Sequence, residues 1–333
     1  MLGFWLRDYY IVRGGRIRRE QNTIYVEYKD GEKKAIPVED VQALYVLGEV
    51  DVNSKLLVFL SQHGIPMHIF NYYGYYSGTY YPRERLLSGF LLVRQVEHYL
   101  DGQRRLEIAR GFVKGACDNI LANLKYYRRR EKEVEQQINE IETEKSAADN
   151  VADIAELMGI EGRTREAYYS SFAAILRRGF ELDRRVKNPP DNMINCLVSF
   201  GNSLVYATVL TEIYHTQLTP TISYLHEPGE RRYSLSLDLS EVFKPVIADR
   251  VIFNLVNNRI IKPEHFFEEL NGCYLTDQGR RVFLKEYDEK LGTTLYHSGL
   301  KRHISYRRLI RLECYKLVRH LLGEVKYKAF RQG

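Results

Sequence analysis

One short segment of the sequence, YLHEPGERRYSLSLDLSEVFKP at residues 224–245, carries an imidazole and two carboxylates. His226 is followed by a Pro-Gly pair among charged residues, which is typical of a surface loop. Ser234 then has the side chain of a good N-cap, and apolar residues from Leu235 onward recur at helical spacing. We therefore expect a loop that bears His226 and a helix that begins at Leu235 and buries its apolar side.

Asp238 and Glu241 lie three residues apart on the expected helix, so their side chains are neighbours on one face. Two carboxylates this close repel, and each needs a cation, a hydrogen-bond donor or water to stay ionised. A divalent metal would satisfy both, and oxygen ligands with one imidazole and open water positions suit Mg²⁺ or Mn²⁺ better than zinc. The same spacing is common on solvated helix faces, so these residues alone leave both interpretations open.

A third acidic candidate, Glu161, stands in the segment LMGIEGRTREAYYSSF. It precedes Gly162, where one helical pattern gives way to another that carries Arg165 and Tyr168. A glutamate at the start of a helix is ordinarily explained by the helix dipole, and the pattern does not decide between that role and metal binding.

The composition excludes few classes of protein. The net charge of +6 over 333 residues is mildly basic, which permits nucleic-acid binding without requiring it. The four cysteines match neither a zinc site nor a redox pair, so we expect four buried thiols in a reducing cytoplasm. Arg7 and Asp8 interrupt the place where a secretory signal would need an apolar run, and we expect no such signal.

Two regions follow from the change of pattern along the chain, and together they predict an α+β fold. Residues 1–82 read as a small β domain with hairpin turns at Gly14-Gly15, Asp30-Gly31 and Gly74, interrupted by one helix at Ser54–His63. Residues 83–333 read as a larger all-helical domain.

Within the helical domain, three segments carry specific expectations. Residues 86–159 predict two or three successive helices, whose charged stretch 128–145 reads as a solvated helix face that could pack Val134, Ile138 and Ile141 on a neighbour. The uncharged run Asn192–Thr211 predicts a core helix, because its asparagines, serines and glycine suit a protein interior better than lipid. The last third is expected to be mostly helical and increasingly basic.

Four motifs occur in order between Glu161 and Tyr287: IEGRTREAYYSSF, PPDNMINCLVSFGNSLVY, YLHEPGERRYSLSLDLSEVFKPVIADR and CYLTDQGRRVFLKEY. Together with the glycine-punctuated N-terminal strands and NYYGYYSGTYYPR, they resemble the CRISPR adaptation integrase family, the nuclease of spacer acquisition. The resemblance covers nearly the whole chain. Two positions depart from the family pattern: Glu241 stands where several members have aspartate, and Asn202 where many have tyrosine.

The resemblance implies a site and a reaction. The family's metal ligands fall on Glu161, His226 and Glu241, with Asp238 as the adjoining acidic residue and Mg²⁺ or Mn²⁺ as the cofactor. The 3′-hydroxyl of a captured DNA fragment would attack a phosphodiester at the border of a CRISPR repeat. In this reaction Lys244, Arg231 and Arg232 are placed to contact DNA phosphates.

The resemblance also implies partners: foreign DNA fragments and the CRISPR repeat, a homodimer formed through the tyrosine-rich β domain, and a small ferredoxin-like CRISPR partner that bridges two dimers. The expected location is the prokaryotic cytoplasm at the nucleoid, without a membrane. Two other functions stay open from the residues: a stand-alone structure-selective nuclease for branched DNA, and a non-catalytic nucleic-acid-binding scaffold whose acids are merely solvated.

Overall fold

The computed structural model describes residues 6–229 and 233–332. Two four-stranded sheets form the N-terminal part. The first has the order β1-β5-β7-β8 and contains β1 (Arg7–Ile11), β5 (Val41–Val46), β7 (Met67–Phe70) and β8 (Tyr76–Tyr80). The second has the order β4-β3-β2-β6 and contains β2 (Gly15–Glu20), β3 (Thr23–Tyr28), β4 (Lys33–Pro37) and β6 (Val50–Val52).

Helix α1 (Ser54–His63) covers this region as predicted, and the short turn η1 (Val38–Asp40) precedes β5. The side chain of Asn53 caps α1 by accepting from the backbone N–H of Leu56 at 3.0 Å, and Gly64 ends it with a φ of +66°. Both sheets and α1 contribute to one apolar cluster, in which Ile17, Val46 and Leu60 are buried. Helix α1 therefore belongs to the β region.

Two of the three predicted hairpin turns are confirmed. Gly31 lies between β3 and β4 with a φ of +87°, and Gly74 lies between β7 and β8 with a φ of +86°. The prediction of a hairpin turn at Gly14-Gly15 is wrong, because the strands on either side, β1 and β2, belong to different sheets. These two glycines instead permit a close approach, since a Cβ on Gly15 would lie 2.2 Å from the carbonyl oxygen of Glu27.

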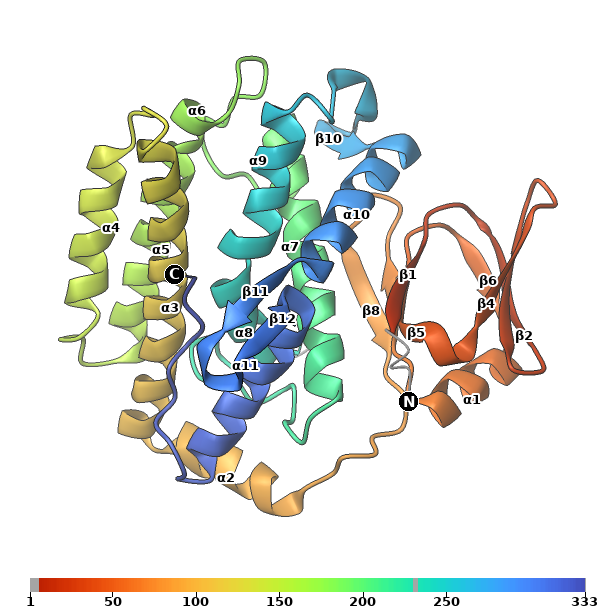
Figure 1. The fold of residues 1–333 in the computed structure, drawn as a ribbon, viewed down its shortest axis with the longest axis horizontal. Coiled ribbons are helices and arrows are strands. Elements are labelled where there is room, and N and C mark those ends of the chain that lie inside the picture. Colours follow the sequence, from red (N-terminus) through yellow and green to blue (C-terminus); the bar gives the residue numbers. More distant parts are fainter. Residues whose placement is uncertain (1–5, 230–232, 333) are drawn as a thin grey trace.

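The rest of the chain is mostly helical, which confirms the predicted fold class, and Figure 1 shows it as a helical body beside the N-terminal strands. Its helices are α2 (Gly89–Leu100), α3 (Gly102–Arg128), α4 (Glu135–Ala147), α5 (Ile154–Ser170), α6 (Phe172–Ile175), α7 (Met193–Tyr214), α8 (Ser234–Phe243), the π-helical turn η2 (Pro245–Asp249), α9 (Arg250–Asn257), η3 (Pro263–His265), α10 (Asp277–Gly292), η4 (Ser298–Leu300) and α11 (Tyr306–Leu321). The predicted boundary after residue 82 falls between the end of β8 and the start of α2.

The segment expected to hold two or three helices holds four, α2 to α5. Asp101 separates α2 from α3 by accepting from the backbone N–H groups of Gln103 and Arg104, at 3.0 and 3.1 Å. Glu131, with a φ of +61°, lies in the break between α3 and α4. The charged pattern concealed this break, although Val134, Ile138 and Ile141 are buried as expected.

Helix α7 lies at the centre of the molecule (Figure 1). Of the described helices it alone is long and apolar enough to cross a membrane, and 83% of that apolar window is buried within the protein, which confirms a core helix. Its polar side chains join it to the first sheet: the hydroxyl of Thr208 lies 3.0 Å from that of Tyr45, and Thr211 lies 2.7 Å from Nε2 of His68.

Two short hairpins interrupt the C-terminal helices and were missed by the sequence pattern. They are β9 (Phe266–Glu269) with β10 (Gly272–Leu275), and β11 (Thr294–His297) with β12 (Arg302–Ser305). Strands of four residues give too little alternation to be recognised in a basic helical context. All four cysteines are free and buried, as expected.

Candidate active site

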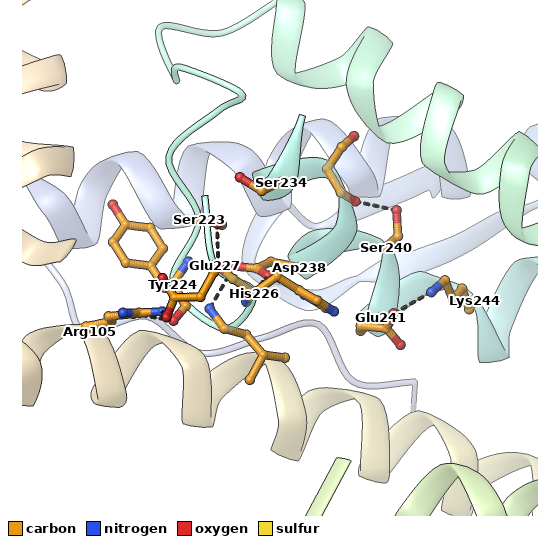
Figure 2. Close-up of polar contacts among 12 residues, drawn as sticks. Arg105, Ser223, Tyr224, His226, Glu227, Ser234, Asp238, Ser240, Glu241 and Lys244 are labelled. Atoms are coloured by element: carbon orange, nitrogen blue, oxygen red, sulfur yellow. Dashed lines mark hydrogen bonds and ion pairs between the residues drawn. The ribbon is translucent and has the colours of Figure 1, made fainter. Parts of the chain in front are cut away.

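Asp238 is fully buried on α8 and binds the loop that carries His226 (Figure 2). Its carboxylate accepts from the backbone N–H groups of Tyr224, Leu225 and His226 at 2.7, 2.9 and 3.0 Å. It also lies 2.8 Å from Nδ1 of His226, and because a carboxylate only accepts, Nδ1 carries the donated proton. These four hydrogen bonds fill the carboxylate, so Asp238 orients His226 and has no oxygen lone pair left over for a metal.

With Nδ1 engaged, Nε2 is the ring nitrogen of His226 that can bind a ligand. The side chain of His226 is 23% exposed. Desolvation alone would lower the pKa of His226, but the hydrogen bond and charge of Asp238, helped by Glu241, raise it above its ordinary value. An imidazole held through Nδ1 by a carboxylate is a common arrangement of metal-binding histidines.

Helix α8 begins one residue earlier than predicted, and Ser234 is not its N-cap. Its hydroxyl donates to the carbonyl oxygen of Thr221 at 2.9 Å, and the preceding residue, Tyr233, makes no side-chain capping bond within the described residues. Ser234 is buried, so its hydroxyl fixes the histidine loop to α8 rather than capping an exposed helix end.

Glu241 lies near the end of α8, buried between two cations. One of its carboxylate oxygens forms an ion pair with Arg165 and the other with Lys244, whose contact is drawn in Figure 2. Burial alone would raise the pKa of Glu241, but the charges of Lys244 and Arg165 bring it far below its usual range. Glu241 is therefore an ionised carboxylate held in place by charge.

Glu161 lies inside α5, about two turns from its start, and not at a junction between helices as the sequence suggested. Helix α5 runs without a break because Asp153 caps it and Leu157, Ile160 and Thr164 bury one side. The helix dipole acts within the first turn, so it does not explain Glu161. Instead Glu161 contacts Nε of Arg165, one turn further on, at 3.2 Å.

The π-helical turn η2 sets the position of Glu241, and the sequence analysis missed it. Pro245 has no N–H, so the carbonyl of Glu241 loses its helical partner and accepts from Nη2 of Arg165 at 3.3 Å. Two asparagines of α3 bind the neighbouring carbonyls: Asn119 that of Val242 at 2.9 Å, and Asn123 that of Pro245 at 2.8 Å. The one local signal for this turn is Pro245 within a helical pattern.

A pocket of about 530 Å³ opens beside the two glutamates. Glu161, Glu241, Arg165 and Lys244 line one side of it, and the segment 182–187 lines another. That segment presents two exposed cations, Arg184 and Lys187. Asn202 of α7 also lines the pocket, and its Oδ1 is buried without a hydrogen-bond partner in the part of the chain that the structure describes.

The predicted DNA-binding residues have different outcomes. Lys244 lines the pocket, but its ammonium group is bound to Glu241 and its side chain is only 15% exposed. Arg231 and Arg232 lie outside the described residues.

The side chains fit Mg²⁺ or Mn²⁺ in their chemistry, since two carboxylates and one oriented imidazole leave positions for water or phosphate oxygen. As they stand, no three His, Cys, Asp or Glu side chains of residues 6–229 and 233–332 form a group that could hold a metal. In this arrangement Arg165 and Lys244 each contact one carboxylate oxygen of Glu241, and Arg165 also binds Glu161. A cation bound by these glutamates would compete with Arg165 and Lys244 for the same negative charge.

Comparison with known proteins decides the family. Residues 9–289 match the family described as CRISPR associated protein Cas1. The chain belongs to the Cas1 family. It is 52% identical to the CRISPR-associated endonuclease Cas1 3 of Thermodesulfovibrio yellowstonii, over 98% of this chain and 99% of the relative.

Solved structures agree with this assignment. A CAS1 protein from Thermotoga maritima superposes with a TM-score of 0.89 at 42% identity, covering 98% of this chain and 100% of the other. A chain of a Cas6-RT-Cas1–Cas2 complex matches with a TM-score of 0.87, although at 15% identity the likeness concerns the fold alone, and 37% of that longer chain is covered. The resemblance and the fold class inferred from the sequence are thus confirmed.

Proposed function

We propose that this protein is a metal-dependent DNA endonuclease and integrase that joins captured DNA fragments to a CRISPR array. The observation that carries the proposal is the placement of His226, Glu161 and Glu241 in one Cas1-family chain, with the imidazole held by Asp238 and both glutamates bound to Arg165. Support comes from the relative of 52% identity, which is named as a CRISPR-associated endonuclease.

In the proposed reaction, the 3′-hydroxyl oxygen of the fragment forms a bond to a repeat phosphorus and loses its proton to solvent. The bond from that phosphorus to the bridging 3′-oxygen breaks, and the leaving 3′-oxygen takes up a proton from solvent to become a hydroxyl. A bound Mg²⁺ or Mn²⁺ would supply Lewis acidity at the phosphoryl oxygen. Glu161, Glu241 and Nε2 of His226 would hold it, while Asp238 keeps the His226 proton on Nδ1. Attack by water in place of the hydroxyl gives hydrolysis, so nuclease activity would use the same site.

The DNA backbone would meet cations on the pocket wall. Arg184 and Lys187 are exposed there, and Lys244 could exchange Glu241 for a phosphate once the glutamate has another partner. Charge reversal at Lys187 should lower DNA affinity and flatten its salt dependence, which a binding titration at several salt concentrations would measure.

The partners are proposed from the family. We expect a homodimer formed through the N-terminal β region, residues 1–82, and a larger complex with the small CRISPR partner Cas2. Light scattering of the purified chain, alone and with that partner, tests both associations. A monomer alone and with the partner would contradict them.

The deciding experiment is strand transfer of a labelled duplex with 3′-hydroxyl ends into a supercoiled CRISPR-array plasmid, with Mn²⁺ or Mg²⁺ and the small partner. We expect the intact protein to form joined product and His226→Ala to form none. A matched control is His303→Ala, which removes an exposed histidine on β12 and should leave the product unchanged. A fragment with 3′-deoxy ends should not be joined.

The other outcomes of this experiment separate the remaining functions. Nicking of the plasmid without joining would favour a stand-alone nuclease for branched DNA. Equal products from the intact protein and from His226→Ala would remove His226 from the mechanism.

A further inference from the structure

Arg165 contacts both glutamates of the candidate site. Its Nε binds Glu161 at 3.2 Å, and its Nη2 binds both the carboxylate and the backbone carbonyl of Glu241. The third nitrogen, Nη1, is buried and has no hydrogen-bond partner in the described part of the chain. The side chain is 12% exposed, so water does not readily replace a lost partner.

Asp249 is the second buried group near this site with an unused atom. It ends the π-helical turn η2, is 1% exposed, and its Oδ2 has no hydrogen-bond partner among residues 6–229 and 233–332. The hydroxyl of Tyr168 interacts with the same carboxylate and acts to lower its pKa. Tyr168 follows Arg165 by three residues on α5, so the two side chains leave the helix on the same side.

Electrostatic coupling agrees with this placement. Burial raises the pKa of Asp249 to about 6 although the nearby charge of Arg165 opposes the rise. Asp249 also acts on Arg165 in return, since its charge is among those that favour the protonated guanidinium. Neither Arg165 nor Asp249 has satisfied its hydrogen-bonding capacity in the arrangement described, and each carries the charge that the other needs.

Metal binding at the two glutamates would change the charge around Arg165. A divalent cation bound by Glu161 and Glu241 would neutralise both carboxylates and remove the partners of Arg165. A buried guanidinium without a carboxylate is strongly unfavourable, and arginine cannot lose its proton. Lys244 has a simpler route, since its flexible ammonium group can turn to solvent or to a DNA phosphate. Arg165 is more enclosed and needs an acceptor inside the protein.

We propose that Asp249 is this acceptor: when Glu161 and Glu241 bind a divalent cation, the guanidinium of Arg165 transfers its ion pair to the free oxygen of Asp249. The inference rests on the proposed function, because it assumes that the two glutamates are metal ligands. Arg165 then stands in for the cation between the glutamates, and Asp249 is a positioning residue that supports metal binding without touching the metal.

The test is a calorimetric titration of the full chain with Mn²⁺ alone, after removal of metals, for the intact protein, Asp249→Asn, Arg165→Gln and the double variant. Asn keeps the size of Asp249 and an oxygen for Tyr168 but loses the charge. We expect Asp249→Asn to weaken Mn²⁺ binding about tenfold, within the usual range of coupling between sites. In the Arg165→Gln background the same change should have no effect, since no guanidinium needs an acceptor.

Equal affinity of the intact protein and Asp249→Asn, or the same loss in both backgrounds, would overturn the proposal. A crystal structure of the intact protein with Mn²⁺ keeps the test valid if a variant does not fold. Nη1 of Arg165 should then lie within hydrogen-bond distance of Asp249, whereas a guanidinium that remains on Glu161 contradicts the inference. Glu161→Gln separates the two hypotheses, because Mn²⁺ affinity that is indifferent to Glu161→Gln refutes the proposed metal site itself.

Discussion

The two halves of the candidate site are held in different ways. The half that contains His226 is fixed by hydrogen bonds from the backbone of residues 224–226 to Asp238, which is fully buried and fully used. The half that contains Glu161 and Glu241 is held by the side chains of Arg165 and Lys244. Backbone groups cannot move without unfolding the loop, whereas long charged side chains can exchange partners.

As a result, His226 is held in a fixed orientation, whereas Glu161 and Glu241 already have cations beside them. Asp238 sets the tautomer and direction of the imidazole in advance, as the proposed metal binding by His226 requires. Arg165 and Lys244 keep Glu241 ionised, and Arg165 also contacts Glu161. A metal ion could take the place of these cations beside the glutamates. Mutations in the two halves should therefore affect activity and stability in different proportions.

The largest effect is expected from Glu241→Gln. Loss of this proposed metal ligand should reduce strand transfer about a thousandfold, because a metal contributes several kcal/mol to the stabilisation of the transition state. The same change leaves Arg165 and Lys244 with a neutral buried partner, and breaking a buried ion pair costs about 3–5 kcal/mol of unfolding free energy. Urea denaturation and a gel assay of joined product measure the two losses.

Glu161→Gln is the matched control for this prediction. It removes a proposed ligand whose side chain is 24% exposed, so activity should fall as far while stability falls by no more than about 1 kcal/mol. Equal stability losses in the two variants would contradict the distinction drawn between the buried and the partly exposed glutamate.

The next largest effect is expected from Asp238→Asn, in the half of the site that contains His226. An amide offers one oxygen where the carboxylate binds three backbone N–H groups and the imidazole, so the loop and the direction of His226 both suffer. Loss of such an orienting group typically lowers metal affinity or activity about 10- to 100-fold. Mn²⁺ titration and strand transfer should show the two losses together.

Ser240→Ala provides a control for Asp238→Asn on the same helix. Among the residues that the structure describes, the Ser240 hydroxyl donates to the carbonyl of Ser236 within α8, so activity should be unchanged. A loss of activity equal to that of Asp238→Asn would mean that general damage to α8, and not the orientation of His226, explains both.

The order of residues along the chain was enough to predict part of this site. His226 and Asp238 lie within one loop and one helix, so their proximity follows from local spacing, and the structure places Nδ1 of His226 2.8 Å from Asp238. Glu241 follows Asp238 by three residues on the same helix. The sequence also identified Glu161 as a candidate but placed it at a helix start. Gly162, which follows it, suggested a junction between two helical patterns, whereas burial of one face of α5 keeps the helix continuous.

The connections between these elements could not be predicted, because each joins segments far apart in the chain. Arg165 and Glu241 are separated by 76 residues, and Asn123 and Pro245 by 122. A sequence pattern shows which side of a helix is apolar, but not which polar side chain on α3 will meet a free carbonyl on η2. For the same reason, the tertiary contacts of Asp249 were not foreseen.

A smaller effect is expected from Asn123→Ala. Asn123 acts on the half of the site that contains Glu241 by binding the backbone of the following turn, η2. Asn123 donates to the carbonyl of Pro245 and to the hydroxyl of Tyr168, and accepts from Nε of Arg250 at 2.7 Å. Leaving these buried groups without partners should cost about 1–3 kcal/mol of unfolding free energy. Asn119→Ala, which frees the carbonyl of Val242, should behave alike, and unchanged denaturation midpoints would show that the two asparagines do not support η2.

The smallest expected effect is a pH dependence of stability that comes from His226. In protein kept free of metal with a chelator, the pKa of His226 lies above its ordinary value of 6.5, because the interactions with Asp238 outweigh desolvation. A raised folded-state pKa means that the protonated imidazole stabilises the fold. This contribution is complete below the unfolded pKa of 6.5 and is lost as the pH rises through the folded value. The difference in melting temperature between the intact protein and His226→Gln should therefore shrink as the pH is raised from acid to alkaline. If this difference in melting temperature grows with pH instead, Asp238 stabilises the neutral imidazole more than the protonated one. The charge of His226 would then not contribute to holding its half of the site.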